Sequence, residues 1–482
     1  MKKNKLTLAI TQIIGLSVFG IQSVSANTSA NYSLSKSSVS LKQIENNCTS
    51  MREDKNSEVR DDFVCDSQTN ERAGGSIIVV DTVAFNTATD GLCSLPEAIE
   101  NANFDNNSFT DCSPGNGADT IRFSPNLNGL TITATDTLEL SSEVTIDGPG
   151  ADQLTISGDN MTNILNFTNS PNNTATINGL TFIEGSTDSF DSVIVNYGHL
   201  TINNSNFNNN NSEYGSTIRN TGSLFLNNVS MDNNESTKRA GAVYHDACAT
   251  LMQINNSSFT NNRNLGEDRG GGAITNTGPS AIIRNSTFVG NTATNIGGAI
   301  YHRFWPLTVL NSTFSNNTAN NDGGAIAASF NGALTIINQS TFINNTATLG
   351  NGASIYTQQT LSLNNSILAG SNALNECIAT TISNNNNNLV EDGSCDENAL
   401  DQLTGDPMLF DLADNGGSTL SFLPMTGSPV IDSGSLSDCA FFDQRGQARP
   451  SDGDGNGSDD CDIGSVEVAN PDVIFKSSFE SF

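Results

Sequence analysis

The sequence predicts an all-β fold, a right-handed parallel β-helix (solenoid) with a short N-terminal capping helix and a small C-terminal domain. Three observations predict it. A phrase such as "STFSNNTANNDGGAI" (312–326) returns along the chain, the segments between turns are short, alternating and rich in β-branched residues, and no helical periodicity of useful length appears among the repeats. Repeats that return every roughly 20–50 residues, as these do, are typical of solenoids and arrays.

Each repeat is anchored by a large apolar residue, at intervals of 24 to 29 residues along the chain. The anchors are Phe182, Phe207, Met231, Phe259, Phe288, Phe314, Phe342 and Ile367. Three residues after most anchors comes an asparagine, at Asn210, Asn234, Asn262, Asn291, Asn317 and Asn345. A glycine-rich step such as "GGAI" (271, 297 and 323) then opens the next strand. We expect each repeat to form one coil.

The stacking of successive coils explains why the sequence repeats. A single coil cannot bury its apolar face, but neighbouring coils about 4.8 Å apart can. The anchors should then stack inside, and each asparagine should hydrogen-bond the equivalent asparagine of the next coil. We expect about nine such coils between residues 130 and 370.

The open first coil needs a cap, because an unpaired solenoid end is a sticky edge. The stretch "CSLPEAIENAN" (93–103) predicts a short amphipathic helix for this role. Ser94 and Glu97 match a capping box, and Pro96 falls in the first turn, where its missing N–H costs little.

The chain begins with a basic, then apolar stretch that ends in a small-residue site, "VSA" (24–26), as a secretory signal peptide does. We therefore expect an exported protein. The formal net charge of −31 repels nucleic acid and anionic lipid and favours cations.

Export makes disulfides the expected state of the nine cysteines. Proximity in the sequence favours three pairs, Cys93 with Cys112, Cys377 with Cys395 and Cys439 with Cys461. Cys48 with Cys65 is a weaker pairing. Cys248 is then left over, and we expect it to be buried and inert. Sequence alone does not fix connectivity.

Three stretches resemble known families of bacterial exported β-helix proteins. "GLCSLPEAIENAN" resembles the Cys-Ser-Leu-Arg-Glu-Ala-Ile (CSLREAI) motif, with Pro96 in place of the usual arginine. The GGA[I/V] and F-x-x-N repeats resemble those of chlamydial polymorphic outer membrane proteins. "DQRGQARPSDGDGNGSDDCDIGSVE" (443–467) resembles the choice-of-anchor Q domain. The resemblance implies a secreted or cell-surface β-helix protein and implies no catalytic residues.

An acidic loop, "DGDGNGSDD" (452–460), alternates oxygen-bearing residues with glycines, as calcium loops do. Its candidate ligands are Asp452, Asp454, Asn456, Ser458 and Asp460. Asp462 or Glu467 would have to complete the coordination sphere, because Ile463 stands where a bidentate glutamate is expected. A flexible acidic turn beside a disulfide is the competing interpretation.

Counting four residues beyond each glycine step gives a column of Arg219, His245, Asn276, His302, Ala328 and Tyr356. Arg219, His245 and His302 on one outward face could serve a polysaccharide lyase or glycoside hydrolase, as base and charge-neutralising groups. A solvated polar column is the competing interpretation, and fold alone does not confer catalysis. His302, Arg303, Phe304 and Trp305 also fit a binding patch for a surface glycan or a protein.

The sequence therefore predicts an exported, adhesin-like or structural protein, located extracellularly or at the outer cell surface, that presents an extended binding face without catalysis. A carbohydrate-active enzyme is the alternative, and a plain spacer rod is a third. The expected layout is a signal peptide at 1–26, an acidic, weakly structured segment at 27–75, a cap at 76–129, β-helix repeats at 130–432, a disulfide-clamped acidic C-terminal domain at 433–468, and a tail at 469–482 that a sorting machine or a docking partner could recognise.

Overall fold

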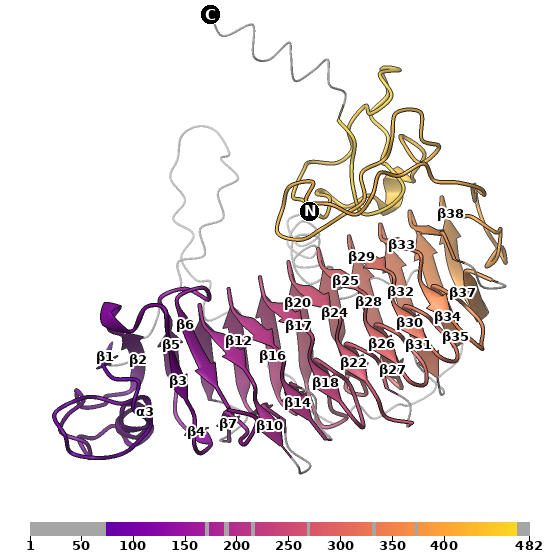
Figure 1. The fold of residues 1–482 in the computed structure, drawn as a ribbon. Helices are drawn as coiled ribbons and strands as arrows, with labels where there is room; N and C mark the ends of the chain where they lie inside the picture. Colours follow the sequence, from indigo (N-terminus) through magenta and orange to yellow (C-terminus); the bar gives the residue numbers. More distant parts are fainter. Residues whose placement is uncertain are drawn as a thin grey trace, which may run out of the picture. The chain divides into compact units, whose positions relative to one another are not determined.

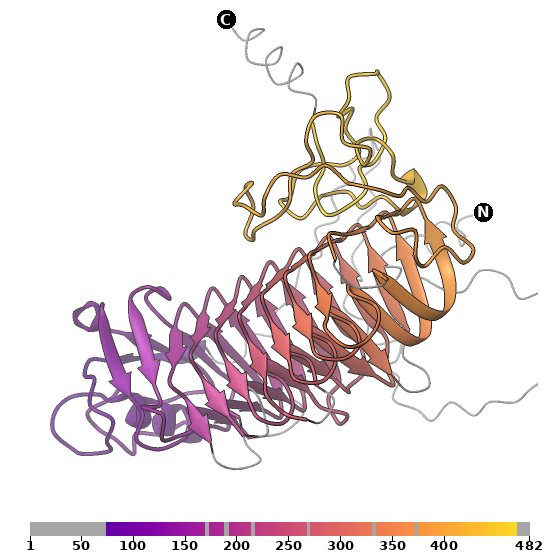
Figure 2. The ribbon, with the colours of Figure 1, turned by 45° about the vertical axis from the view of Figure 1, so that its right-hand side comes forward.

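A computed structural model describes residues 74–168, 173–187, 192–213, 217–267, 270–329, 334–371 and 375–469. The expected signal peptide, nearly all of the segment at 27–75, the Cys48–Cys65 pair and the tail beyond residue 469 lie outside these residues. The described residues belong to one compact unit. Its strands stack as successive parallel coils, from β1 and β2 at one end to β37 and β38 at the other (Figures 1 and 2). The expected parallel β-helix is confirmed.

Two faces of each coil join in one 20-stranded parallel sheet. Its first face consists of β4 (Leu138–Leu140), β7 (Leu165–Phe167), β11 (Ile194–Asn196), β15 (Ile218–Asn220), β19 (Val243–His245), β23 (Ile274–Asn276), β27 (Ile300–Arg303) and β31 (Ile326–Ser329). Its second face consists of β1 (Gly74–Val80), β2 (Ala118–Phe123), β5 (Val144–Asp147), β8 (Thr174–Asn178), β12 (His199–Asn203), β16 (Ser223–Asn227), β20 (Leu251–Asn255), β24 (Ala281–Arg284), β28 (Leu307–Leu310) and β32 (Thr335–Asn338). The long strands β35 (Ile355–Asn364) and β37 (Cys377–Asn386) serve both faces.

The third face is an 11-stranded sheet, and a 7-stranded sheet of two-residue strands closes the coil. The third face consists of β3 (Leu130–Thr133), β6 (Leu154–Ser157), β9 (Thr181–Ile183), β13 (Asn206–Asn208), β17 (Ser230–Asp232), β21 (Ser258–Thr260), β25 (Thr287–Val289), β29 (Thr313–Ser315), β33 (Thr341–Ile343), β36 (Ile367–Ala369) and β38 (Leu389–Val390). The short strands are β10 (Ser186–Thr187), β14 (Asn211–Ser212), β18 (Glu235–Ser236), β22 (Arg263–Asn264), β26 (Thr292–Ala293), β30 (Thr318–Ala319) and β34 (Thr346–Ala347).

The anchors of the repeat stack along the axis inside the coils. The ring centroids of Phe288 and Phe314 lie 4.7 Å apart, and those of Phe314 and Phe342 lie 4.6 Å apart, with nearly parallel planes. All three side chains are fully buried. The strand spacing dictates this face-to-face geometry, because the parallel ladder holds equivalent residues in register. Met231 replaces a ring in the same column, where its flexible thioether fills the gap between Phe207 and Phe259.

The buried asparagines form the expected ladder. The Nδ2 of Asn317 donates to Oδ1 of Asn345 at 2.9 Å and to the backbone oxygen of Phe288 at 3.0 Å. Its Oδ1 accepts from the backbone N–H of Asn291 at 3.0 Å and from the Asn291 side chain at 2.9 Å. One amide thus satisfies backbone groups of the turn that would otherwise be buried without partners.

The glycine step lets one coil approach the next. A Cβ on Gly298 would lie 2.0 Å from the carbonyl oxygen of Gly324 and 2.6 Å from the backbone nitrogen of Thr318. The preceding Gly297 has a φ of +71°, in the left-handed region that favours glycine. "GGAI" is therefore required by the backbone itself.

The N-terminal cap is the expected helix, α3 (Leu95–Phe104). Glu97 N–H donates to Ser94 Oγ, and Ser94 N–H donates to Glu97 Oε2 at 3.0 Å, so the capping box is confirmed. The helix lies against β1, β2 and β4, and η1 (Pro125–Leu127) follows β2. Because β1 pairs with β2 and β2 with β5, the coil ladder begins inside the segment expected to be only a cap.

All three favoured disulfides are present, Cys93–Cys112, Cys377–Cys395 and Cys439–Cys461. The expectation for Cys248 is wrong, because this free cysteine is exposed. It lies in the loop that follows β19, where an insertion beyond the strand carries the chain outward.

The last strand is β38, so regular coils end well before residue 432, where the repeats were expected to end. The described residues after it contain isolated bridges and η2 (Leu436–Asp438), and they lie over the third face of the last coils (Figure 1). Gln444 connects the two regions, since its Oε1 accepts from Thr313 Oγ1 at 2.6 Å and its Nε2 donates to Thr287 Oγ1 at 2.8 Å. The threonine of "STF" is thus the outward residue on which the C-terminal region docks.

We predict that Asn317→Ala destabilises the protein by on the order of 3 kcal/mol, because it strands buried backbone donors and acceptors on two neighbouring coils. Chemical denaturation followed by circular dichroism measures the loss. Asn320→Ala, at an exposed position of the same coil, is the control and should be neutral. Equal stability of the two variants would contradict the role of the ladder.

Candidate binding groove on the first face

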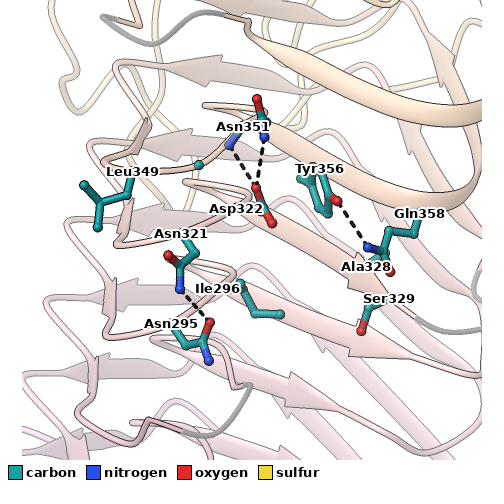
Figure 3. Close-up of a pocket in the computed structure, with 11 residues that line it drawn as sticks. Asn295, Ile296, Asn321, Asp322, Ala328, Ser329, Leu349, Asn351, Tyr356 and Gln358 are labelled. Atoms are coloured by element: carbon teal, nitrogen blue, oxygen red, sulfur yellow. Dashed lines mark hydrogen bonds between the residues drawn. The ribbon is translucent and has the colours of Figure 1, made fainter.

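A groove lies on the outside of the first face, over the last coils. Tyr301, Ala327 and Tyr356 occupy equivalent outward positions of β27, β31 and β35. The small Ala327 lies between the two tyrosines in this column. The groove, with a volume of about 410 Å³, lies beside it, and Tyr356 is the member of the column that lines the groove (Figure 3). This volume is within the usual range of small-ligand sites.

A small apolar cluster lies beside the groove and reaches its lining at Ile296. Ile296, Tyr301 and Ala327 form a small cluster of buried residues that is separate from the core inside the coils. The hydroxyl groups of Tyr301 and Ser329 are hydrogen-bonded at 2.7 Å, which fixes the ring over the next coil. Ala328 lines the groove beside Ser329.

The rim is mostly neutral and polar. Asn321 donates to Asn295 at 3.0 Å, and Gln358 donates to the Tyr356 hydroxyl at 3.2 Å (Figure 3). The remaining lining residues are Asp322, Leu349, Gly350 and Asn351. Asp322 is the one ionisable carboxylate among them and accepts the backbone N–H of Asn351 at 2.9 Å. No lysine, arginine or histidine lines the groove among the described residues.

The proposed catalytic column does not form an outward site. His245 and His302 occupy equivalent positions, but both side chains point into the coils and are fully buried. Arg219 does not belong to this column, since it pairs with Tyr244 and its neighbour Asn220 pairs with His245. Arg219 lies outside and forms an ion pair with Asp246 at 2.9 Å.

Burial keeps both histidines neutral. It lowers the pKa of His245 and of His302 to about 4. His245 accepts at Nδ1 from Asn220 at 2.9 Å, so its Nε2–H donates to the Pro279 carbonyl. Thr335 hydroxyl lies 2.8 Å from His302 Nε2. These contacts are structural, and they leave no ring nitrogen directed at solvent.

The four residues of the predicted binding patch at 302–305 do not share one surface, because His302 is buried. His302 lies inside, whereas Phe304 and Trp305 are 43% and 47% exposed. Phe304 has a φ of 71°, and Trp305 N–H donates to the Arg303 carbonyl at 2.9 Å, which makes a strained three-residue turn. The Arg303 guanidinium lies 4.7 Å from the centroid of the Phe304 ring. Strained turns that expose bulky residues are commonly functional.

The predicted calcium loop converges on a different set of residues. Carboxylate oxygens of Asp432, Asp452 and Asp454 lie within 4.8 Å of one another. Burial raises the pKa of Asp432, and the nearby Asp454 charge adds to the effect. Asp460 instead accepts a hydrogen bond from Ser458 at 2.9 Å.

The other predicted calcium ligands have partners of their own. Asn456 donates to Asp454 at 3.0 Å. Asp462 and Glu467, the residues expected to close the sphere, are buried and accept backbone N–H groups of Asp432 and Ser451 at 2.8 Å.

Sequence reasoning missed the groove and Asp432. The signal for the groove was the alternation "GGAIY", "GGAIA", "GASIY" at 297, 323 and 352, which shows a small residue between two tyrosines at one position of the repeat. Asp432 gave no signal, because it lies 20 residues before the loop it joins.

Comparison with known families matches the coils that carry the groove. The model of the Chlamydia polymorphic membrane protein (Chlamydia_PMP) repeat matches residues 285–303 and 311–329. These ranges include Ile296 and Ser329 of the groove and the strands β27 and β31. Comparison with curated proteins gives no match for the chain. Among the described residues, no helix is long and apolar enough to span a bilayer.

We predict that acid weakens the coils through the two buried histidines. Between pH 6.5 and about 4 the unfolded chain binds protons that the folded chain does not, so the free energy of unfolding falls as the pH drops. The full shift corresponds to about 3 kcal/mol for each histidine. Denaturation at pH 7 and pH 4 should show a smaller loss for His245→Asn, since asparagine occupies this position in neighbouring coils. His199→Asn, on the second face, is the matched control substitution. An unchanged slope in His245→Asn would contradict the assignment.

Calcium binding stays a prediction, and the structure sharpens its test. We expect calcium to raise the melting temperature of the metal-free protein and Asp432→Asn to abolish that rise, because three converging carboxylates repel one another until a cation joins them. Asp460→Asn should keep the effect, since its side chain lies in a hydrogen bond with Ser458. Thermal unfolding with calcium and with a chelator distinguishes the two. Loss of the effect in Asp460→Asn alone would favour the loop pattern inferred from sequence.

Proposed function

We propose that this protein is a surface-exposed, adhesin-like β-helix protein that binds a ligand in the groove that Tyr356 lines on the first face. The groove is the observation that carries the proposal. It is a concavity on regular parallel coils, with the apolar Ile296 and the Tyr356 ring among mostly polar lining residues, and binding sites are usually placed in such concavities.

Two further observations support an outer-surface location. The repeat matched at 285–303 and 311–329 belongs to a family of surface membrane proteins. The disulfides and the expected signal peptide fit an oxidising, exported environment. A solenoid also places its lateral faces at a distance from either end, where a partner can reach them.

The carbohydrate-active alternative loses its proposed residues. An enzyme acting through Arg219, His245 and His302 needs them on one accessible surface, but the two imidazoles are buried and the guanidinium is paired with Asp246. A general base must reach the proton that it removes. We therefore propose binding without turnover at this face.

The test is attachment of the purified full chain to intact cells and to immobilised extracellular polymers, comparing wild type with Tyr356→Ala. Loss of the aromatic ring should reduce attachment at least severalfold, because the ring lines the groove. Tyr244→Ala is the matched control, since Tyr244 occupies the same outward position several coils away. Equal attachment of both variants would move the binding face elsewhere.

A further inference from the structure

The groove and the strained aromatic loop follow one another along the solenoid axis. Arg303, the last residue of β27, is in register with Ser329 of the groove. Phe304 and Trp305 come directly after Arg303 and are both exposed. A ligand leaving the groove at Ser329 toward the preceding coil would therefore meet two aromatic rings.

The chemistry of the groove matches an uncharged sugar chain. Pyranose rings have an apolar C–H face and a rim of hydroxyl groups. Tyr356 and Ile296 provide apolar surface, while Asn295, Asn321 and Gln358 provide amides, each of which can both donate and accept.

Charge argues against acidic glycans and against nucleic acid. The chain carries a formal net charge of −31, and the lining of the groove contributes a carboxylate, Asp322, with no described cationic side chain beside it. Inside the groove, a polyuronate or sulfated glycan would lose its hydration without gaining a cation, and the Arg303 guanidinium at the outer loop lies over the Phe304 ring, 4.7 Å from its centroid. The volume of about 410 Å³ also fits a few sugar rings better than the flat surface of a protein partner.

The repeat sets the direction of the ligand. Asn295 and Asn321 are equivalent residues of two successive coils, and Leu349 takes this position in the next coil, where Asn351 follows in the same turn. The groove lining therefore extends along the axis over three successive coils. The coil spacing, 4.6–4.7 Å between stacked rings of the same coils, is close to the advance of one sugar unit in an extended chain. A linear glycan lying along the axis can place successive units against successive coils.

We propose that the groove and the Phe304–Trp305 loop form one extended site for a linear, uncharged polysaccharide that runs parallel to the solenoid axis. The inference rests on the proposed function, because it names the ligand class of the same groove. Tyr356 borders the inner subsite, and Trp305 and Phe304 form an outer subsite that longer chains reach.

The test uses the single tryptophan of the chain as its reporter. Defined neutral oligosaccharides (β-linked glucose, mannose and N-acetylglucosamine series, two to six units by design) are titrated into the full chain, with oligogalacturonate and a sulfated oligosaccharide in parallel. We expect at least one neutral series to bind, with affinity rising with length. The longer members should change Trp305 fluorescence.

Variants separate the two subsites when binding is measured by calorimetry. Tyr356→Ala should weaken every length by roughly tenfold, and Trp305→Ala should weaken only the longer chains by a similar factor. Tyr244→Ala should bind like wild type. An equal effect of Trp305→Ala on all lengths, or none on any, would overturn the extended site.

The outcomes also separate this inference from the proposed function. Binding of the charged oligosaccharides in preference to every neutral series would overturn the ligand class. Attachment to cells that depends on Tyr356, without affinity for any neutral series, would overturn the inference and leave the proposed function standing. If attachment does not depend on Tyr356 and no neutral oligosaccharide binds, both the inference and the proposed function are overturned.

Discussion

The register of the parallel coils is the constraint on which the rest of the structure depends. Each residue is held beside its equivalent one coil away, so every side chain must tolerate a copy of itself or a chosen replacement at less than 5 Å. Phenylalanine meets this condition by stacking its ring. Asparagine meets it because its amide donates on one side and accepts on the other. The repeated sequence therefore consists of residues that can pack against, or hydrogen-bond to, an identical residue of the neighbouring coil.

The same constraint explains where binding chemistry can arise. A column of identical residues gives a flat, saturated surface, and a recess needs a position where the column is broken. Ala327 between Tyr301 and Tyr356 is such a break. The loop at Phe304 is another, since it exposes two aromatic rings where Phe304 has a positive φ. Both breaks lie in the same few coils, where Arg303 at the start of the loop is in register with Ser329 of the groove.

Much of the fold could be predicted because stacking makes the pattern visible in one dimension. The Phe314 and Asn317 columns, the helix cap at Ser94 and the disulfides all follow from local spacing. The orientation of the histidine column did not. Counting from the glycine step assigned Arg219 to it, but the coil that contains Arg219 lacks the double glycine, and a shift of one residue turns a side chain from inside to outside. Short strands with only three residues give alternation too little length to settle the matter.

Contacts that join distant parts of the chain were also beyond sequence reasoning, and the C-terminal region shows what they add. Gln444 of its "DQRG" stretch hydrogen-bonds the threonines of the coils. Farther along the chain, the buried Arg449 forms an ion pair with Glu467 and interacts with the charge of Asp462. Burial raises the pKa of Asp462 to about 8, and the neighbouring Glu467 charge adds to this. Arg445 and Asp443 complete the cluster, in which three buried carboxylates face two guanidinium groups.

The cluster has one more carboxylate than it has guanidinium groups. Near neutral pH the folded cluster therefore retains a proton on Asp462 that the unfolded chain has lost. Its contribution to stability is therefore present in acid and is lost as the pH rises through the raised pKa of Asp462, about 8. The histidines inside the coils have the opposite dependence, because burial keeps them neutral and acid penalises them. The histidine contribution is complete above pH 6.5, whereas the Asp462 contribution is complete only below its ordinary pKa of 3.8 and declines up to about pH 8. Between about pH 4 and 6.5 the two dependences therefore oppose each other. Near neutrality the coils keep the full histidine contribution, while most of the Asp462 contribution to the docked C-terminal region is already lost.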